Sequence, residues 1–267
     1  MSRFSKKIGF VFLFTLILSV QSRAEMGKAG SSTSEATTPQ AKTGLVFSLR
    51  PEMGFVNPVA LNESTTSMNT AVSGLYKVNG ADAPMVSNTI QANMYLGYAF
   101  SDSLDVGAFF SIPPMTTKKI SGQSAAGTAA TRTVGLSASM LGLQANYAFV
   151  KTDNFRVYAS PAIGWGSFSV IDKLESGAAG YDIVMESKNI AMKGSLGVAY
   201  QLSPLFSLQG EAGYMQWNSG SLTHKNAFAA KGINAGDTAK NATGDGDLKT
   251  DLSGPFIGVG VTFTYPI

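Results

Sequence analysis

The chain has 267 residues, of which only 14% are charged, with 29 glycines, a single histidine and no cysteine. The lack of cysteine excludes disulfides, thiolate metal sites, a cysteine nucleophile and a lipid-modified N-terminal cysteine. The sequence pI of about 9.0 would suggest a nucleic-acid partner. However, four of the 20 basic residues lie within residues 1–24, and the other 16 stand against 17 acidic residues. We therefore expect no nucleic-acid partner, no metal site and no cofactor.

Residues 1–24 have the organisation of a secretory signal peptide. Arg3, Lys6 and Lys7 give a positive start, residues 8–20 form an uncharged apolar run, and Ser22 and Ala24 supply the small residues of a cleavage site. An uncleaved anchor is the alternative, but the run is shorter than the roughly 20 residues that span a bilayer. Residues 25–43 have little to bury, and we expect a flexible periplasmic lead-in there.

From residue 44 to residue 267 the chain alternates between apolar strands and turns. Three turns resemble copies of one unit, in which a tyrosine precedes a tight polar turn and a new strand, at Tyr98, Tyr147 and Tyr200. Longer polar connections separate these units, at about residues 57–87, 113–133, 171–186 and 219–250. Short turns at one end and long loops at the other are typical of an up-and-down barrel.

The facing of the side chains indicates a barrel that lies in a membrane. In the predicted strand at residues 90–100, Ile90, Met94 and Leu96 share one face, while Gln91 and Asn93 share the other. A soluble lipocalin-like barrel would show the same alternation, with its polar face toward water. That face would be rich in Lys and Glu, whereas here it is rich in Gly, Ser, Gln and Asn, so we predict an apolar face toward lipid.

Aromatic residues collect near the predicted short turns, where an interfacial girdle would lie. Ordinary strand propensity is the alternative explanation. The predicted girdle consists of Tyr98, Phe100, Tyr147, Phe149, Tyr200, Phe206, Phe263 and Tyr265.

The signal peptide, the eight strands and the repeated tyrosine turn units resemble the eight-stranded outer-membrane β-barrel family that includes OmpA, OmpX and OmpW. The resemblance covers residues 44–267 and implies an all-β, eight-stranded antiparallel up-and-down transmembrane barrel. It also implies short periplasmic turns and four long external loops. Members usually end in an aromatic residue that the assembly machinery recognises, whereas here Pro266 and Ile267 follow Tyr265.

Six charged residues fall on the inner face by strand parity. A charge that points into lipid at mid-depth costs about 2–4 kcal/mol, whereas one that faces the lumen need not. We expect these charges to pair and close the lumen, and a polar path for small solutes is the alternative. The predicted lumen cluster consists of Arg50, Glu52, Asp105, Arg156, Lys193 and Glu211.

Two strand prolines, Pro51 and Pro161, fall on the lipid face, and each removes a backbone donor. We expect a β-bulge at each. The resemblance to OmpW-like barrels offers another interpretation, in which a gap in the wall releases small hydrophobic molecules sideways.

The sequence offers little catalytic chemistry. Lipid A deacylases in the resembling family need a His with a nearby Ser and an acidic residue, and His224 is the one candidate base. Its neighbours do not match the spacing in those enzymes, so we predict no catalytic residues. Asp245, Asp247 and Asp251 could gather a cation, but their spacing does not match a calcium loop.

We therefore predict a monomeric outer-membrane barrel with a structural or surface-interaction role. The predicted partners are outer-membrane lipid, the outer-membrane assembly machinery and a surface ligand bound through the loops. A narrow pore or lateral-release channel for small solutes is the alternative function, and a lipid A-modifying enzyme is a weaker one.

Overall fold

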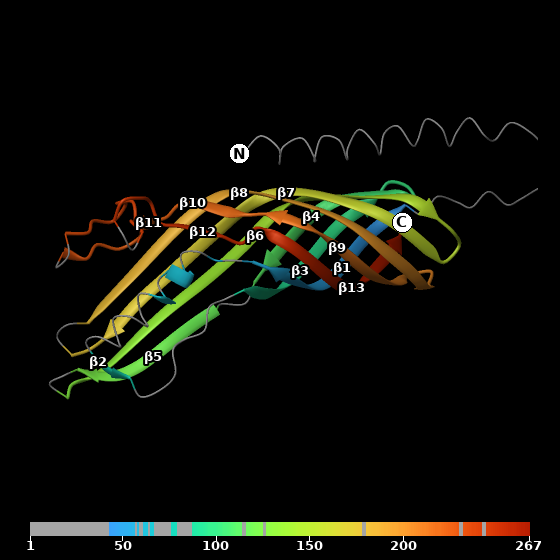
Figure 1. The fold of residues 1–267 in the computed structure, drawn as a ribbon. Helices are drawn as coiled ribbons and strands as arrows, with labels where there is room; N and C mark the ends of the chain where they lie inside the picture. The colour runs from blue at the N-terminus through green and yellow to red at the C-terminus, as the bar shows by residue number, and fades with distance from the viewer. Residues whose placement is uncertain are drawn as a thin grey trace, which may run out of the picture. The chain divides into compact units, whose positions relative to one another are not determined.

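Eight strands pair side by side into a closed antiparallel ring in the computed structural model (Figure 1). Each of them pairs with two neighbours, and the ring closes where the last strand of the chain pairs with the first. In order around the ring they are β1 (Gly44–Phe55), β3 (Asn88–Ala99), β4 (Leu104–Ile112), β6 (Ala129–Lys151), β7 (Phe155–Glu175), β8 (Tyr181–Ser203), β9 (Phe206–Gln216) and β13 (Gly254–Pro266).

The structure describes residues 43–56, 58, 61–63, 65–66, 76–78, 87–113, 116–124, 127–177, 180–229, 232–241 and 244–267. The predicted signal peptide and nearly all of the predicted lead-in lie outside these residues. Within them, no helix has the length and apolar character needed to cross a membrane.

Three short connections lie at one end of the barrel, which we call the short-turn end. They join β3 to β4, β6 to β7 and β8 to β9, and both termini of the barrel lie there too. The other four connections lie at the opposite end, which we call the loop end; three of them are long, and the one between β7 and β8 is a short turn. This arrangement confirms the predicted up-and-down barrel.

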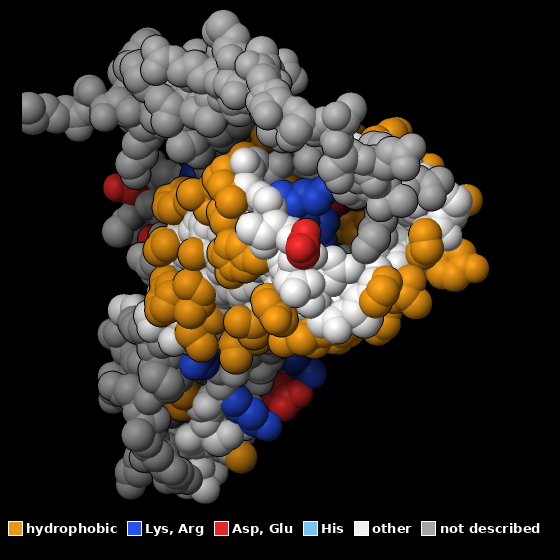
Figure 2. Space-filling model, turned by 90° about the vertical axis from the view of Figure 1, so that its right-hand side faces the viewer, with side chains coloured by type: hydrophobic (Ala, Val, Ile, Leu, Met, Phe, Trp, Pro, Cys, Tyr) orange, Lys and Arg blue, Asp and Glu red, His pale blue; other side chains and the backbone are white. Residues whose placement is uncertain are grey.

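The predicted facing is also confirmed. Along β1, exposed and buried positions alternate without exception. Leu45 and Phe47 point outward and are nearly half exposed, whereas Ser48, Arg50 and Glu52 point inward and are at most 4% exposed. Figure 2, which looks onto the short-turn end, shows hydrophobic side chains around the outside of the ring and charged side chains in its middle. A polar interior inside an apolar wall is the arrangement of a membrane barrel.

Two of the predicted loops are wrong in detail, because much of their length forms strand. β5 (Thr116–Ser124) pairs with the first part of β6, and β7 and β8 remain paired up to Leu174 and Tyr181. The long strands β6, β7 and β8 therefore continue past the other strands at the loop end as a sheet extension (Figure 1). A short strand, β2 (Tyr76–Val78), pairs with the outer edge of β5.

The facing pattern inverts where the wall becomes this extension. Apolar residues such as Val134, Phe168 and Val170 now lie on the inner face and are completely buried, while Ser137 and Ser169 lie on the outer face. Because the outer face no longer meets lipid, the apolar side turns toward the other loop-end segments. Because of this reversal, the sequence pattern of these residues predicted polar loops instead of strands.

The fourth connection also carries short strands. β10 (Asn218–Ser221) pairs with β12 (Lys249–Asp251), and β11 (Thr223–His224) adds to the edge of β8. Leu222, Leu248 and Leu252 are buried beneath these strands and join the inner apolar cluster.

The two strand prolines do not cause bulges, contrary to our expectation. The pairing of β1 with β3 passes through Pro51 without a shift, as does that of β7 with β8 through Pro161. On the other side of each strand, the pairing omits the proline and resumes in the same register. Proline thus interrupts one ladder by its missing N–H and leaves the register intact.

Candidate functional site

Four of the six predicted lumen charges meet at mid-height in one cluster, which we call the charged ring. Arg50 and Glu52 lie on β1, Lys193 on β8 and Glu211 on β9, and every one of them is at most 6% exposed. These strands are not all adjacent, because β13 separates β1 from β9 in the wall. The cluster therefore spans the lumen.

The signs alternate around the charged ring, so that each cation touches both anions. Arg50 Nε lies 3.1 Å from Glu52 Oε1, and its Nη1 lies 3.0 Å from Glu211 Oε2. Lys193 Nζ lies 3.2 Å from Glu211 Oε1 and also pairs with Glu52 Oε1. Four ion pairs thus join four residues of zero total charge, which offsets the cost of burying them.

Neutral side chains also donate hydrogen bonds to the carboxylates of the charged ring. Gln91 Nε2 and Asn93 Nδ2 each donate to Glu52 over 2.8 Å, and Ser195 Oγ donates to Glu211 over 3.1 Å. On the loop side, Lys193 Nζ lies 4.3 Å from the centre of the Phe256 ring, within the range of a cation–π contact. Among the described residues, Glu52 is thus contacted by two cations and two amide donors.

Asp105 and Arg156 do not join the charged ring. Asp105 lies nearer the short-turn end, where it accepts hydrogen bonds from Tyr95 Oη over 2.5 Å and from Asn146 Nδ2 over 2.6 Å. Ser160 Oγ donates to the same Asn146 side chain. Arg156 is half-buried near the start of β7. The six charges thus divide into four in the mid-height ring, Asp105 in a separate polar network, and Arg156 near the start of β7.

Sequence reasoning missed the apolar side chains that fill the lumen on the loop side of the charged ring. They lie on inward positions of β6, β7, β9 and β13 or directly after them, and each is at most 1% exposed. The rings of Phe168 and Trp217 pack 5.0 Å apart, centre to centre. We call this group the apolar plug, and its members are Met140, Phe168, Met215, Trp217 and Phe256.

Inward glycines make room for aromatic rings in the lumen. A Cβ atom at Gly166 would collide with the Trp217 indole, and one at Gly97 would collide with the Tyr95 ring. Gly197 stands in the same relation to Tyr158. Strand parity could have identified these positions, since each glycine lies on the polar face that we assigned to the lumen.

The residues of the predicted girdle lie near the short-turn end, on the outer surface. Tyr98 and Phe100 form an edge-to-face pair at 5.1 Å, and Phe206 and Phe263 form another at 4.9 Å. Tyr200 and Tyr265 are more than half exposed. Tyr147 is partly exposed and Phe149 is exposed on β6.

His224 does not lie in a catalytic arrangement within the described residues. Its backbone N–H donates to the Asp237 carbonyl over 2.9 Å, and Nδ1 has no hydrogen-bond partner there. Burial lowers the pKa of His224, and the nearby Asp237 carboxylate partly opposes that shift. Nor does any group of three or more His, Asp or Glu side chains in the described part of the chain converge as a metal site.

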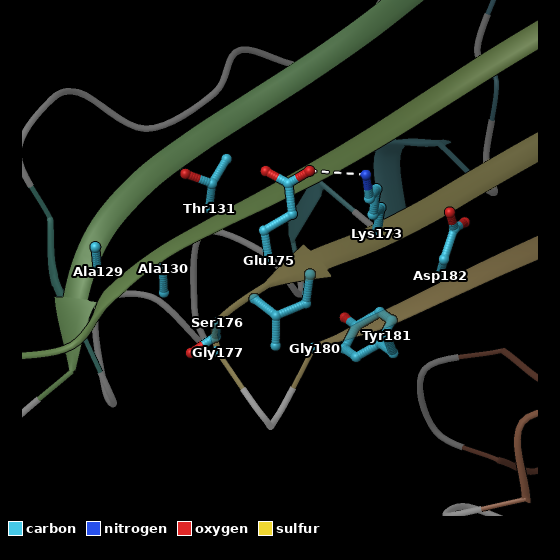
Figure 3. Close-up of a pocket in the computed structure, with 11 residues that line it drawn as sticks. Ala129, Ala130, Thr131, Lys173, Glu175, Ser176, Gly177, Gly180, Tyr181 and Asp182 are labelled. Atoms are coloured by element: carbon cyan, nitrogen blue, oxygen red, sulfur yellow. Dashed lines mark ion pairs between the residues drawn. The ribbon is translucent and has the colours of Figure 1, made fainter.

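A hollow lies at the tip of the β7–β8 hairpin (Figure 3). It is a wide, open depression of about 700 Å³, with Thr131, Lys173, Glu175, Tyr181 and Asp182 among its lining residues. Lys173 and Glu175 pair with each other across 2.7 Å. The depression lies at the tips of β7 and β8, whereas the charged ring lies at mid-height in the barrel.

The chain matches no family model and no curated protein. OprG from Pseudomonas aeruginosa is 15% identical, with a TM-score of 0.46, over 85% of this chain and 98% of its own. Neisserial surface protein A is 11% identical, with a TM-score of 0.43, over 83% and 97%. Ail of Yersinia pestis, solved with the heparin analogue sucrose octasulfate, is 11% identical, with a TM-score of 0.37, over 84% and 99%. Sequence identities and TM-scores this low support no conclusion about function, and the assignment of a barrel depends on this chain's own strand pairing.

Proposed function

We propose that the chain is a monomeric outer-membrane barrel that is exported by its signal peptide and acts through the surface at its loop end. In this proposal the lumen does not conduct. The observation that carries it is the combination of the charged ring and the apolar plug, which lie one after the other in the lumen. A solute that moved through the lumen would have to separate the four buried ion pairs of the charged ring and then pass the packed side chains of the apolar plug.

The length of the apolar wall supports placement in an outer membrane. On β7 the outward apolar residues run from Phe155 to Trp165, ten residues further on, and serine takes the outward position at Ser167. At a rise of about 3.3 Å per residue and a tilt of about 40°, this length spans about 25 Å. That is the height of the apolar band in outer-membrane barrels.

The sheet extension supports a surface-interaction role. Arg132 of β6 and Asp172 of β7 form two hydrogen bonds, of 2.9 and 2.6 Å, on its inner face, and Tyr181 Oη donates to the same carboxylate. These contacts hold three adjacent strands together beyond the apolar wall. A surface with fixed side chains loses less entropy on binding than a flexible loop does. A surface ligand would therefore meet a preorganised sheet.

Electrical recording in planar bilayers tests the proposal. The purified barrel is expected to give no steady single-channel current, while a general porin in the same bilayers gives one. Stable conductance by the folded barrel would contradict it. Release of fatty acid from lipid A by the barrel in detergent would instead indicate an enzyme.

Lateral release of small apolar molecules is the second candidate function. Within the described residues, the first part of β3 pairs with β1 only, because its pairing with β4 begins at Ala92. A narrow apolar pocket lies beside this free edge, lined by Leu61, Thr89, Pro113 and Leu136, among others. An apolar solute could leave the wall here without passing the charged ring.

Filling the pocket distinguishes the two functions. In liposomes, a Leu136→Trp variant should block uptake of a small apolar dye if the pocket is a route. Under the surface-interaction proposal, the native barrel and this variant should give the same uptake as empty liposomes.

A further inference from the structure

The outer surface of β6, β7 and β8 changes from apolar to polar within one row of residues. Leu141, Trp165 and Ile190 are partners in register across the three strands and are all more than half exposed. The next outward row, two residues toward the loop end, consists of Ser139, Ser167 and Lys188. The two rows are about 7 Å apart along the strands. If the apolar wall lies in lipid, the second row lies at the level of the lipid headgroups.

Lys188 differs from the other cations of the neighbouring sheet surface. Lys225 pairs with Glu186 at 2.6 Å, and Lys173 pairs with Glu175 at 2.7 Å. Lys188 is exposed and makes no ion pair or hydrogen bond with the described residues. Its neighbour in register is Ser167, whose hydroxyl lies on the same face. An ammonium group and a hydroxyl side by side offer donors without an anion to neutralise them.

We propose that Lys188, together with Ser167, binds the phosphate of an anionic lipid headgroup in the leaflet at the loop end. The inference rests on the proposed placement of the barrel in a membrane. The row that contains Ser167 and Lys188 directly follows the apolar wall, so a lipid whose chains cover Trp165 and Ile190 brings its phosphate to Lys188. A cation at this depth attracts anionic headgroups. The outer wall of the barrel favours a lipid over a soluble ligand, which would need a concave site.

Quenching of tryptophan fluorescence by brominated lipids provides the test, because Trp165 is 71% exposed beside the proposed site and the other tryptophan, Trp217, is buried in the lumen. The full barrel is reconstituted in mixtures of ordinary lipid with phosphatidylglycerol or phosphatidylcholine brominated near the top of the acyl chain. We expect about a three- to fivefold preference for the anionic lipid around Trp165 at low salt. Lys188→Gln should abolish the preference.

Lys225→Gln is the matched control, since it removes a nearby cation that is already paired with Glu186. It should leave the preference unchanged. Equal quenching by both brominated lipids in the native barrel would overturn the headgroup site and leave the membrane placement intact. Absence of quenching by either lipid would overturn the membrane placement itself. A preference that survives in Lys188→Gln would assign the binding to another group and also overturn the inference.

Discussion

Lys193→Met is the perturbation that tests the charged ring most directly. The change removes contacts from Lys193 to Glu52 and Glu211 and the cation–π contact with Phe256. Among the residues that the structure describes, Arg50 then remains as the one cation in contact with the two buried carboxylates. Removal of one partner of a buried ion pair costs about 3–5 kcal/mol, because it leaves an uncompensated charge. We expect a loss of this size in the free energy of unfolding.

Reversible urea unfolding in lipid vesicles, followed by tryptophan fluorescence, measures this loss. The matched control is Lys193→Met combined with Glu211→Gln, which removes one charge of each sign and keeps the pair of Arg50 with Glu52. Because that double variant is neutral, it should lose less than half as much stability as the single variant. The two variants together separate the effect of charge imbalance from that of lost contacts.

An exchange of charges tests the alternation of signs. Lys193→Glu combined with Glu211→Lys would restore an isolated ion pair. In the charged ring, however, the exchange places a lysine beside Arg50 and a glutamate beside Glu52, so it should fail to restore stability. Recovery of stability in the exchanged variant would refute the ring of four ion pairs. An unchanged free energy of unfolding in Lys193→Met would refute it too.

Three further predictions concern the wall, the lumen and the loop end. Leu96→Arg, on a side chain that is 61% exposed on the outer face, should cost about 2–4 kcal/mol in vesicle unfolding, and equal stability would contradict the lipid-facing assignment. Gly166→Ala should cost about 1–3 kcal/mol in the same assay, because its Cβ meets the Trp217 indole. The control is Gly177→Ala at an exposed position, where the new Cβ meets no atom and the variant therefore tests only backbone strain. The lowered pKa of His224 means that the fold disfavours its protonated form. Its contribution to stability is present above about pH 6.5 and is lost as the pH falls through the lowered pKa. The protection factors of the Gly236 and His224 amides, which correct for the intrinsic exchange rate at each pH, should therefore fall in acid, and His224→Gln should remove that dependence.

Most of the wall could be predicted because lipid enforces strict alternation. In β3, Ile90, Met94 and Leu96 point outward and Gln91 and Asn93 are buried, as the alternation indicates. The rule fails past the apolar wall, where the outer face meets water. There the same alternation continues with its faces exchanged, and hydroxyl residues on the outside obscure it. Position along the strand decides which face is apolar, and single-sequence alternation does not supply that position.

The lumen was predictable only in part, for a different reason. Strand parity places Arg50, Glu52, Lys193 and Glu211 on the inner face, and counting from the short turns gives them similar heights. Their partners depend on the stagger between strands, which side-chain type does not determine. Trp217 was missed because it directly follows β9, where the chain leaves the wall, so its role depends on how the next segment folds back.

The order of the two barriers leads to a last prediction about conduction. The charged ring is polar and the apolar plug consists of packed, buried apolar side chains, so an ion that passes one still meets the other. An ion in a dry apolar segment loses its hydration at a cost of many kcal/mol. Lys193→Met should therefore destabilise the barrel without conduction, and Trp217→Ala should leave the ion pairs closed. Only the combined variant should give steady current in planar bilayers, provided that its resistance to protease shows that it is folded. Current through either single variant would show that one barrier alone closes the lumen.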